Sequence, residues 1–140
     1  MSGIESTLTR REALRSPALV GAIGLAGAGL LHFHDPHTTG SYGFCPFLAL
    51  TGHPCPGCGG LRALNDLTRD DVGAAVSSNI LAVGLVVVLA VAFVRWVVRR
   101  WRRENVRMIV LSPAWAIAVV VLIFVFAVVR NTPWGSWLAP

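Results

Sequence analysis

The stretch that decides the fold is residues 80–98, which read ILAVGLVVVLAVAFVRWVV. This run holds one charged residue, Arg95, close to its end. A helix needs about 20 apolar residues to cross roughly 30 Å of hydrocarbon, and an arginine near a helix end can extend its guanidinium group to the lipid headgroups. Because lipid offers no hydrogen-bond partner to an irregular backbone, these residues are predicted to form a transmembrane helix.

Two further apolar runs lie at residues 17–33 and 113–129. The first is about the shortest length that crosses a bilayer. The second follows Ser112, a suitable helix cap, and begins at Pro113, where proline favours the first turn of a helix. Aromatic residues that suit the headgroup level lie near its ends: Trp115, Trp134 and Trp137. The predicted fold class is an all-α membrane protein with three transmembrane helices.

The composition supports this class. Of 140 residues, 54% are hydrophobic and only 14% are charged, whereas about 25% is usual for a soluble protein. The mean hydropathy is +0.64. All twelve basic residues are arginine, so the formal net charge of +5 stays ionised. A soluble domain of this length is therefore excluded, and the lipid bilayer is the expected environment.

The arginines predict an orientation. The N-terminal segment, residues 1–16, contains Arg10, Arg11 and Arg15. The connection between the second and third spans, residues 99–112, contains five arginines. Residues 34–79 hold two arginines against four aspartates, and residues 130–140 hold one arginine. Because arginine-rich flanks stay on the cytoplasmic side, residues 1–16 and 99–112 are predicted to be a cytoplasmic tail and connection. Residues 34–79 and 130–140 are predicted to be an outer loop and an outer tail.

An alternative remains open at the N-terminus. The pair Arg10-Arg11 before a short Gly/Ala-rich run is similar to a twin-arginine secretion signal, with a cleavage site at residues 26–28. Cleavage there would leave two spans. An uncleaved first span is favoured because apolar sequence continues beyond Ala28.

The outer loop contains all three cysteines of the chain. Cys45 begins a short apolar segment over residues 45–52, which we expect at the membrane interface. Cys55-Pro56-Gly57-Cys58 is a tight turn by composition. Residues 60–67 have the pattern of a short interfacial helix, and residues 68–71 resemble a capping box for a following helix that runs toward the second span.

Several short motifs of this loop occur together in one known family. They are Cys45-Pro46, Thr51-Gly52, Cys55-Pro56-Gly57-Cys58-Gly59, Leu61-Arg62-Ala63 and Asn79. Over about Phe44 to Val98 the chain resembles the small bacterial membrane proteins grouped as domain-of-unknown-function family 2752. The resemblance implies a multi-span protein of a bacterial cytoplasmic (inner) membrane, and it implies no activity.

One hypothesis for the cysteines is thiol–disulfide exchange. Cys55 and Cys58 lie before a predicted helix, where partly positive backbone amides lower a thiol pKa, and Arg62 follows one turn later. Cys45 is then a third thiol that resolves the exchange or links to a substrate. Against this hypothesis, the chain lacks the βαβ pattern of thioredoxin-like enzymes.

A second hypothesis is a zinc or copper site. Cys45, Cys55, Cys58 and His53 supply the four ligands of a closed zinc site. A second candidate cluster for zinc or copper is formed by three histidines: His32, His34 and His37. Covalent haem is excluded because Gly59, not histidine, follows Cys58.

The favoured hypothesis is a non-enzymatic accessory or scaffold protein whose outer loop is stabilised by a disulfide or a metal. Extracytoplasmic cysteines tend to oxidise, which favours the disulfide. The partner is then another membrane protein or a second copy of the chain. The arginine-rich run 95–103 is explained by topology and by contact with anionic lipid, so no nucleic acid is expected.

Overall fold

The computed structural model describes residues 9–38, 45–104, 106–110 and 112–138, and within these ranges the regular structure is entirely helical. The predicted all-α fold class is therefore confirmed. The predicted N-terminal tail of residues 1–16 lies partly outside the described residues, as does Phe44 at the start of the family resemblance. The helices are α1 (Arg10–Phe33), α2 (Pro46–Thr51), α3 (Gly60–Thr68), α4 (Val72–Trp101) and α5 (Pro113–Arg130), followed by the 3₁₀ helix η1 (Pro133–Leu138).

Three of these helices, α1, α4 and α5, are long and apolar enough to cross a membrane. Only 6%, 6% and 11% of the residues in their most apolar windows are buried inside the protein. Large hydrophobic side chains along all three helices are exposed, as expected for surfaces that face lipid. The protein is a multi-pass membrane protein in a lipid bilayer.

The helix ends differ in detail from the predicted spans. Helix α1 begins at Arg10 rather than at residue 17, because Thr9 and Glu12 form a reciprocal capping box. Helix α5 begins as predicted, since the Ser112 hydroxyl accepts a hydrogen bond from the backbone amide of Trp115.

The second span is part of a longer helix. Helix α4 starts at Val72 and passes through Asn79, where the backbone leaves the helical conformation (φ −168°, ψ 98°). The capping box predicted over residues 68–71 is wrong. Asp71 alone caps α4 by accepting from the amide of Ala74, whereas the Thr68 hydroxyl donates to the carbonyl of Asn65 at the end of α3.

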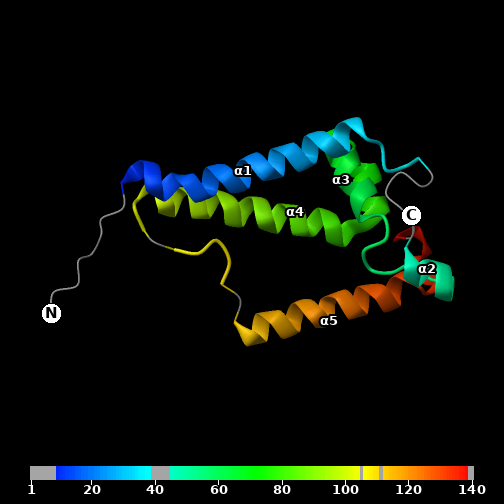
Figure 1. The fold of residues 1–140 in the computed structure, drawn as a ribbon. Helices are drawn as coiled ribbons and strands as arrows, with labels where there is room; N and C mark the ends of the chain where they lie inside the picture. Colours follow the sequence, from blue (N-terminus) through cyan, green and yellow to red (C-terminus); the bar gives the residue numbers. More distant parts are fainter. Residues whose placement is uncertain (1–8, 39–44, 105, 111, 139–140) are drawn as a thin grey trace.

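Two of the long helices, α1 and α4, pack against each other, and the third, α5, lies apart from them over most of its length (Figure 1). Helices α1 and α4 lie side by side in opposite directions, and α3 packs across the end of α1 and the start of α4 (Figure 1). Helix α5 diverges from this pair and meets the rest of the protein at the end where α2 and the cysteine turn lie (Figure 1). The buried polar side chains come from three helices: Asn65, Asp66, Asn79 and Arg130. The fold thus gathers its buried polar groups around α3, the start of α4 and the end of α5.

Candidate metal centre

The three thiols converge between α2 and α3. Cys45 is the residue before α2, and Cys55 and Cys58 lie in the turn before α3. The Sγ atoms of Cys45 and Cys55 are 3.5 Å apart, and those of Cys55 and Cys58 are 3.0 Å apart. All three sulfurs lie within 4.8 Å of one another as free thiols. The sequence therefore singled out residues that the fold brings to one point.

Local backbone geometry explains the turn. The amide of Cys58 donates to the carbonyl of Cys55 (3.1 Å), and the amide of Gly60 donates to the carbonyl of Gly57 (3.0 Å). Gly59 adopts a left-handed conformation (φ 78°), which glycine reaches without the steric cost of a Cβ. The amide of Cys55 also donates to the sulfur of Cys58 (3.3 Å). The turn thus presents its sulfurs on one side together with a backbone donor.

Arg130, the last residue of α5, forms hydrogen bonds with the backbone of this turn. One guanidinium nitrogen donates to the carbonyls of Cys55 (3.1 Å) and Cys58 (2.8 Å), although about 72 to 75 residues separate them in sequence. The guanidinium carbon lies 5.6 Å from the centroid of the Phe126 ring, in cation–π contact. The side chain is 2% exposed. An arginine that sequence analysis treated as a membrane flank is therefore a buried part of the site.

Two asparagines complete the attachment of the loop. Asn79, at the break in α4, donates its side-chain amide to the carbonyls of Pro56 (2.9 Å) and Cys58 (3.0 Å), and its side-chain oxygen accepts from the amide of Ala82. Asn131 donates to the carbonyl of Pro54 (3.1 Å). Carbonyl groups throughout the turn are thus bonded to side chains from α4 and from the end of α5.

The environments of the thiols differ. The backbone amide of Leu48, followed by the thiols of Cys58 and Cys55, lowers the pKa of Cys45 to about 7. Burial, followed by hydrogen bonding to Cys55 and Cys45, raises the pKa of Cys58 to about 12. The expectation of a lowered thiol pKa is therefore not met at Cys58, where burial and the neighbouring thiols outweigh the hydrogen bond from the backbone amide of Cys55.

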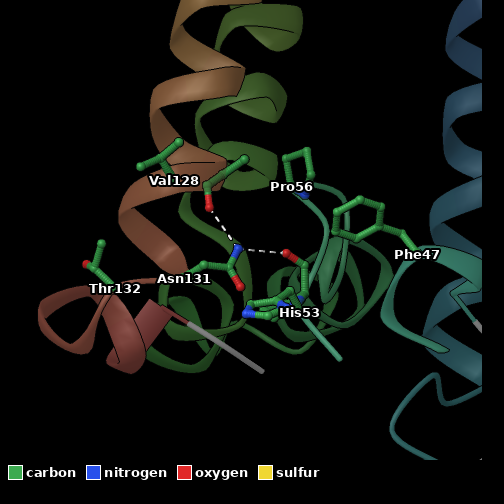
Figure 2. A pocket seen from close by; sticks show the side chains of 8 residues that line it. Phe47, His53, Pro56, Val128, Asn131 and Thr132 are labelled. Atoms are coloured by element: carbon green, nitrogen blue, oxygen red, sulfur yellow. Dashed lines mark hydrogen bonds between the residues drawn. The ribbon is translucent and has the colours of Figure 1, made fainter. Parts of the chain in front are cut away.

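His53 lies beside the cluster, on the side of α5. Its Nδ1 donates to the carbonyl of Thr51 (2.7 Å), and its backbone amide donates to the Thr51 hydroxyl (3.2 Å). The ring lines a pocket of about 440 Å³. Figure 2 shows the ring beside Asn131, which donates to the backbone carbonyls of Pro54 and Ala127. His53 is not a member of the three-sulfur group.

The other predicted cluster has a different arrangement. The Nδ1 atom of His32 lies 3.2 Å from the Thr68 hydroxyl. The two ring nitrogens of His37 lie 2.8 Å from Asp35 and 3.3 Å from Asp66. Among the described residues, the ligand atoms of His32, His34 and His37 do not gather within one group as the sulfurs do. The contacts of His32 and His37 tie the end of α1 to α3.

Sequence reasoning named Asn79 only as part of the family motif, and it did not predict that three residues hold the turn: Asn79, Arg130 and Asn131. The available signal was an asparagine at the edge of an apolar run and an Arg-Asn pair at the end of another. Polar residues at such positions are costly unless they are paired. Without the fold, however, nothing shows that both runs end at the same turn.

Comparison with known proteins identifies one family. The model described as "Protein of unknown function (DUF2752)" matches residues 45–93, a segment that contains all three cysteines and Asn79. Neither the curated proteins nor the solved structures give a match. The resemblance stated from the motifs is confirmed: over residues 45–93 this chain matches domain-of-unknown-function family 2752.

Proposed function

We propose that this protein is a non-enzymatic accessory or scaffold protein whose outer loop is stabilised by a soft metal ion bound to Cys45, Cys55 and Cys58. The observation that carries the proposal is the convergence of three sulfur atoms within 4.8 Å. Thiolates are the protein ligands that favour zinc and monovalent copper. A site with three protein ligands leaves a fourth position of zinc for water or for a group of a partner.

His53 is the candidate for that fourth position from within the chain. Its Nδ1 is engaged by the Thr51 carbonyl, so Nε2 is the atom that a metal would take. A hydrogen bond from Nδ1 to a backbone carbonyl is also a common way to orient a histidine ligand. Closing a four-ligand site requires the loop to move His53 toward the sulfurs.

Metal analysis tests the proposal. The full-length protein is purified in detergent without reductant, and bound zinc and copper are measured together with the thiol state by mass spectrometry. We expect close to one zinc or copper ion per chain in the wild type and a loss of most of it in Cys58→Ser and Cys45→Ser. His32→Ala is the matched control, because His32 bonds to Thr68 away from the sulfurs. A wild type that stays metal-free after exposure to either ion would contradict the proposal.

The same measurement separates the disulfide alternatives. A Cys55–Cys58 disulfide found in metal-free protein favours a loop held by a covalent bond. Thiol–disulfide exchange is favoured by the 3.0 Å separation of those sulfurs and by the contrast between the pKa values of Cys45 and Cys58. In that reaction the two thiols lose two electrons and two protons to a partner disulfide, which is reduced to two thiols. Trapping of a mixed disulfide by Cys58→Ser would identify it.

The location belongs to the same proposal. We place the protein in a bacterial cytoplasmic membrane with the N-terminus and residues 99–112 in the cytoplasm and the cysteines outside. The arginine distribution supports this orientation, and the antiparallel arrangement of α1 and α4 puts the start of α1 and the end of α4 at the same end of the helix pair (Figure 1). A membrane-impermeant maleimide, applied to intact cells under reducing conditions, is expected to label the cysteines. Labelling only after lysis would indicate the opposite orientation, with the cysteines in the cytoplasm.

A further inference from the structure

Arg130 is a buried cation that forms no ion pair with a carboxylate of the residues described by the structure. Its side chain is 2% exposed at the end of α5. In the part of the chain that the structure describes, no ion pair within 4.0 Å joins it to an aspartate or a glutamate. A buried charge is costly unless a full opposite charge lies near it. A source of negative charge close to this guanidinium group would therefore stabilise it.

The hydrogen bonds of Arg130 indicate where that charge belongs. Its donors reach the carbonyls of Cys55, Cys58 and, at 3.5 Å, Ser78. Its Nε atom is buried without an acceptor. Carbonyl oxygens carry only partial charge, and two of the three that Arg130 reaches belong to Cys55 and Cys58, two of the three clustered thiols. The guanidinium group is thus bonded directly to the backbone of the turn whose thiols become thiolates when they bind a metal ion.

We propose that Arg130 is the positioning residue and counter-cation of the Cys45–Cys55–Cys58 cluster when the cluster holds a divalent metal ion, an inference that rests on the proposed function. Three thiolates and a divalent ion leave one negative charge, which the guanidinium group neutralises. The same side chain fixes the turn through the carbonyls of Cys55 and Cys58. Arg130 thus acts on the metal ligands in two ways: its charge balances the thiolates, and its hydrogen bonds fix the backbone of the residues that carry them.

Two substitutions separate charge from hydrogen bonding. Arg130→Gln keeps a side-chain donor but removes the positive charge, and Arg130→Lys keeps the charge but loses the planar fork. Removing a group that supports metal ligands commonly lowers metal affinity by about 10- to 100-fold. We expect Arg130→Gln to lose affinity in this range and Arg130→Lys to lose clearly less. A purely structural role through hydrogen bonds would not favour lysine over glutamine.

The experiment uses full-length protein in detergent micelles. Affinity for Zn²⁺ is measured by competition with a chromophoric chelator, and the ligand geometry is followed by the absorption spectrum of bound Co²⁺. Size-exclusion chromatography and circular dichroism establish that each variant is folded. Arg95→Gln is the matched control, because it removes an exposed arginine from the arginine-rich end of α4; its affinity should equal that of the wild type.

The outcomes distinguish this inference from the proposed function. A wild type that binds none of Zn²⁺, Co²⁺ and Cu⁺ overturns both, and one that binds only Cu⁺ overturns this inference alone. A wild type that binds, with Arg130→Gln equal to it or with Arg130→Lys as weak as Arg130→Gln, overturns only the role of Arg130. If Arg130→Gln does not fold, the test rests on Arg130→Lys. A Zn²⁺ affinity within about threefold of the wild type, with an unchanged Co²⁺ spectrum, supports the inference. A loss of Zn²⁺ affinity of about tenfold or more in folded protein overturns it.

Discussion

The end of the molecule that carries the cysteine turn and the three membrane spans are built in different ways. Along the spans, at most 11% of the residues in the most apolar windows are buried inside the protein. At the turn, side chains from distant parts of the chain are buried and bonded to backbone carbonyls, including Asn79 and Arg130. Lipid therefore supports one region, and specific hydrogen bonds hold the other.

Insertion of the helices into the membrane and folding of the cysteine turn therefore depend on different properties of the sequence. A span needs only length and apolar composition to be stable in hydrocarbon. The turn needs particular donors, because a buried carbonyl without a partner costs about 1–3 kcal/mol. Substitutions near the cysteines are therefore expected to have larger effects than substitutions of lipid-facing residues.

The largest expected effect lies within the cysteine turn itself. In metal-free, reduced protein at pH 8, Cys45 with a pKa of about 7 is mostly ionised, whereas Cys58 with a pKa of about 12 is ionised at roughly one part in 10⁴. Because the thiolate is the nucleophile, alkylation of Cys45 should reach half its maximal rate near pH 7. Cys58 should remain almost unmodified. Timed iodoacetamide labelling followed by peptide mass spectrometry measures both rates.

The control for this prediction is the same labelling in denatured protein. There, burial no longer raises the pKa of Cys58, and both thiols should react at similar rates, with ordinary pKa values near 8.5. Equal reactivity of Cys45 and Cys58 in the folded protein would mean that the turn does not bury Cys58, and the contrast between the two regions would weaken.

The next effect concerns Asn79, which links α4 to the turn. Asn79→Ala removes hydrogen bonds to the carbonyls of Pro56 and Cys58 and to the amide of Ala82. We expect the free energy of unfolding to fall by about 2–4 kcal/mol, because several buried groups lose their partner. Thermal unfolding in detergent micelles, followed by circular dichroism, measures the change.

Leu85→Ala is the comparison for Asn79→Ala on the same helix. Leu85 is 57% exposed on the lipid-facing surface of α4, so its truncation leaves no internal cavity. A destabilisation by Leu85→Ala as large as that by Asn79→Ala would show that the spans, and not the turn, hold the fold together.

The same contrast explains how much the sequence could predict. The apolar run of residues 80–98 and the cap at Ser112 led directly to α4 and α5, because hydropathy and local capping act within one segment. The helix expected after residues 68–71 does run into the second span as the start of α4, but the sequence did not predict the break in the helical backbone at Asn79. Lipid-facing structure is thus readable from short stretches of sequence.

The site was only partly predictable. Cys45, Cys55 and Cys58 stood out by type and spacing, and the structure brings them together. The hydrogen bonds from Arg130 to the carbonyls of Cys55 and Cys58 join residues more than 70 positions apart. No local pattern encodes such contacts, because they form only when α5 ends beside the turn that precedes α3.

The smallest expected effect is at the opposite, arginine-rich end of α4. Trp96 is 8% exposed, and its indole nitrogen donates to the carbonyl of Val106 (3.0 Å). Trp96→Phe keeps the ring packing but removes this bond, so unfolding should become easier by about 0.5–1.5 kcal/mol. Trp115→Phe, at a 67% exposed position, should change little in the same thermal unfolding measurement. If Trp96→Phe lowers the free energy of unfolding more than Asn79→Ala does, hydrogen bonding at this end of α4 contributes more to stability than the attachment of the cysteine turn. The order of the two expected effects would then be wrong.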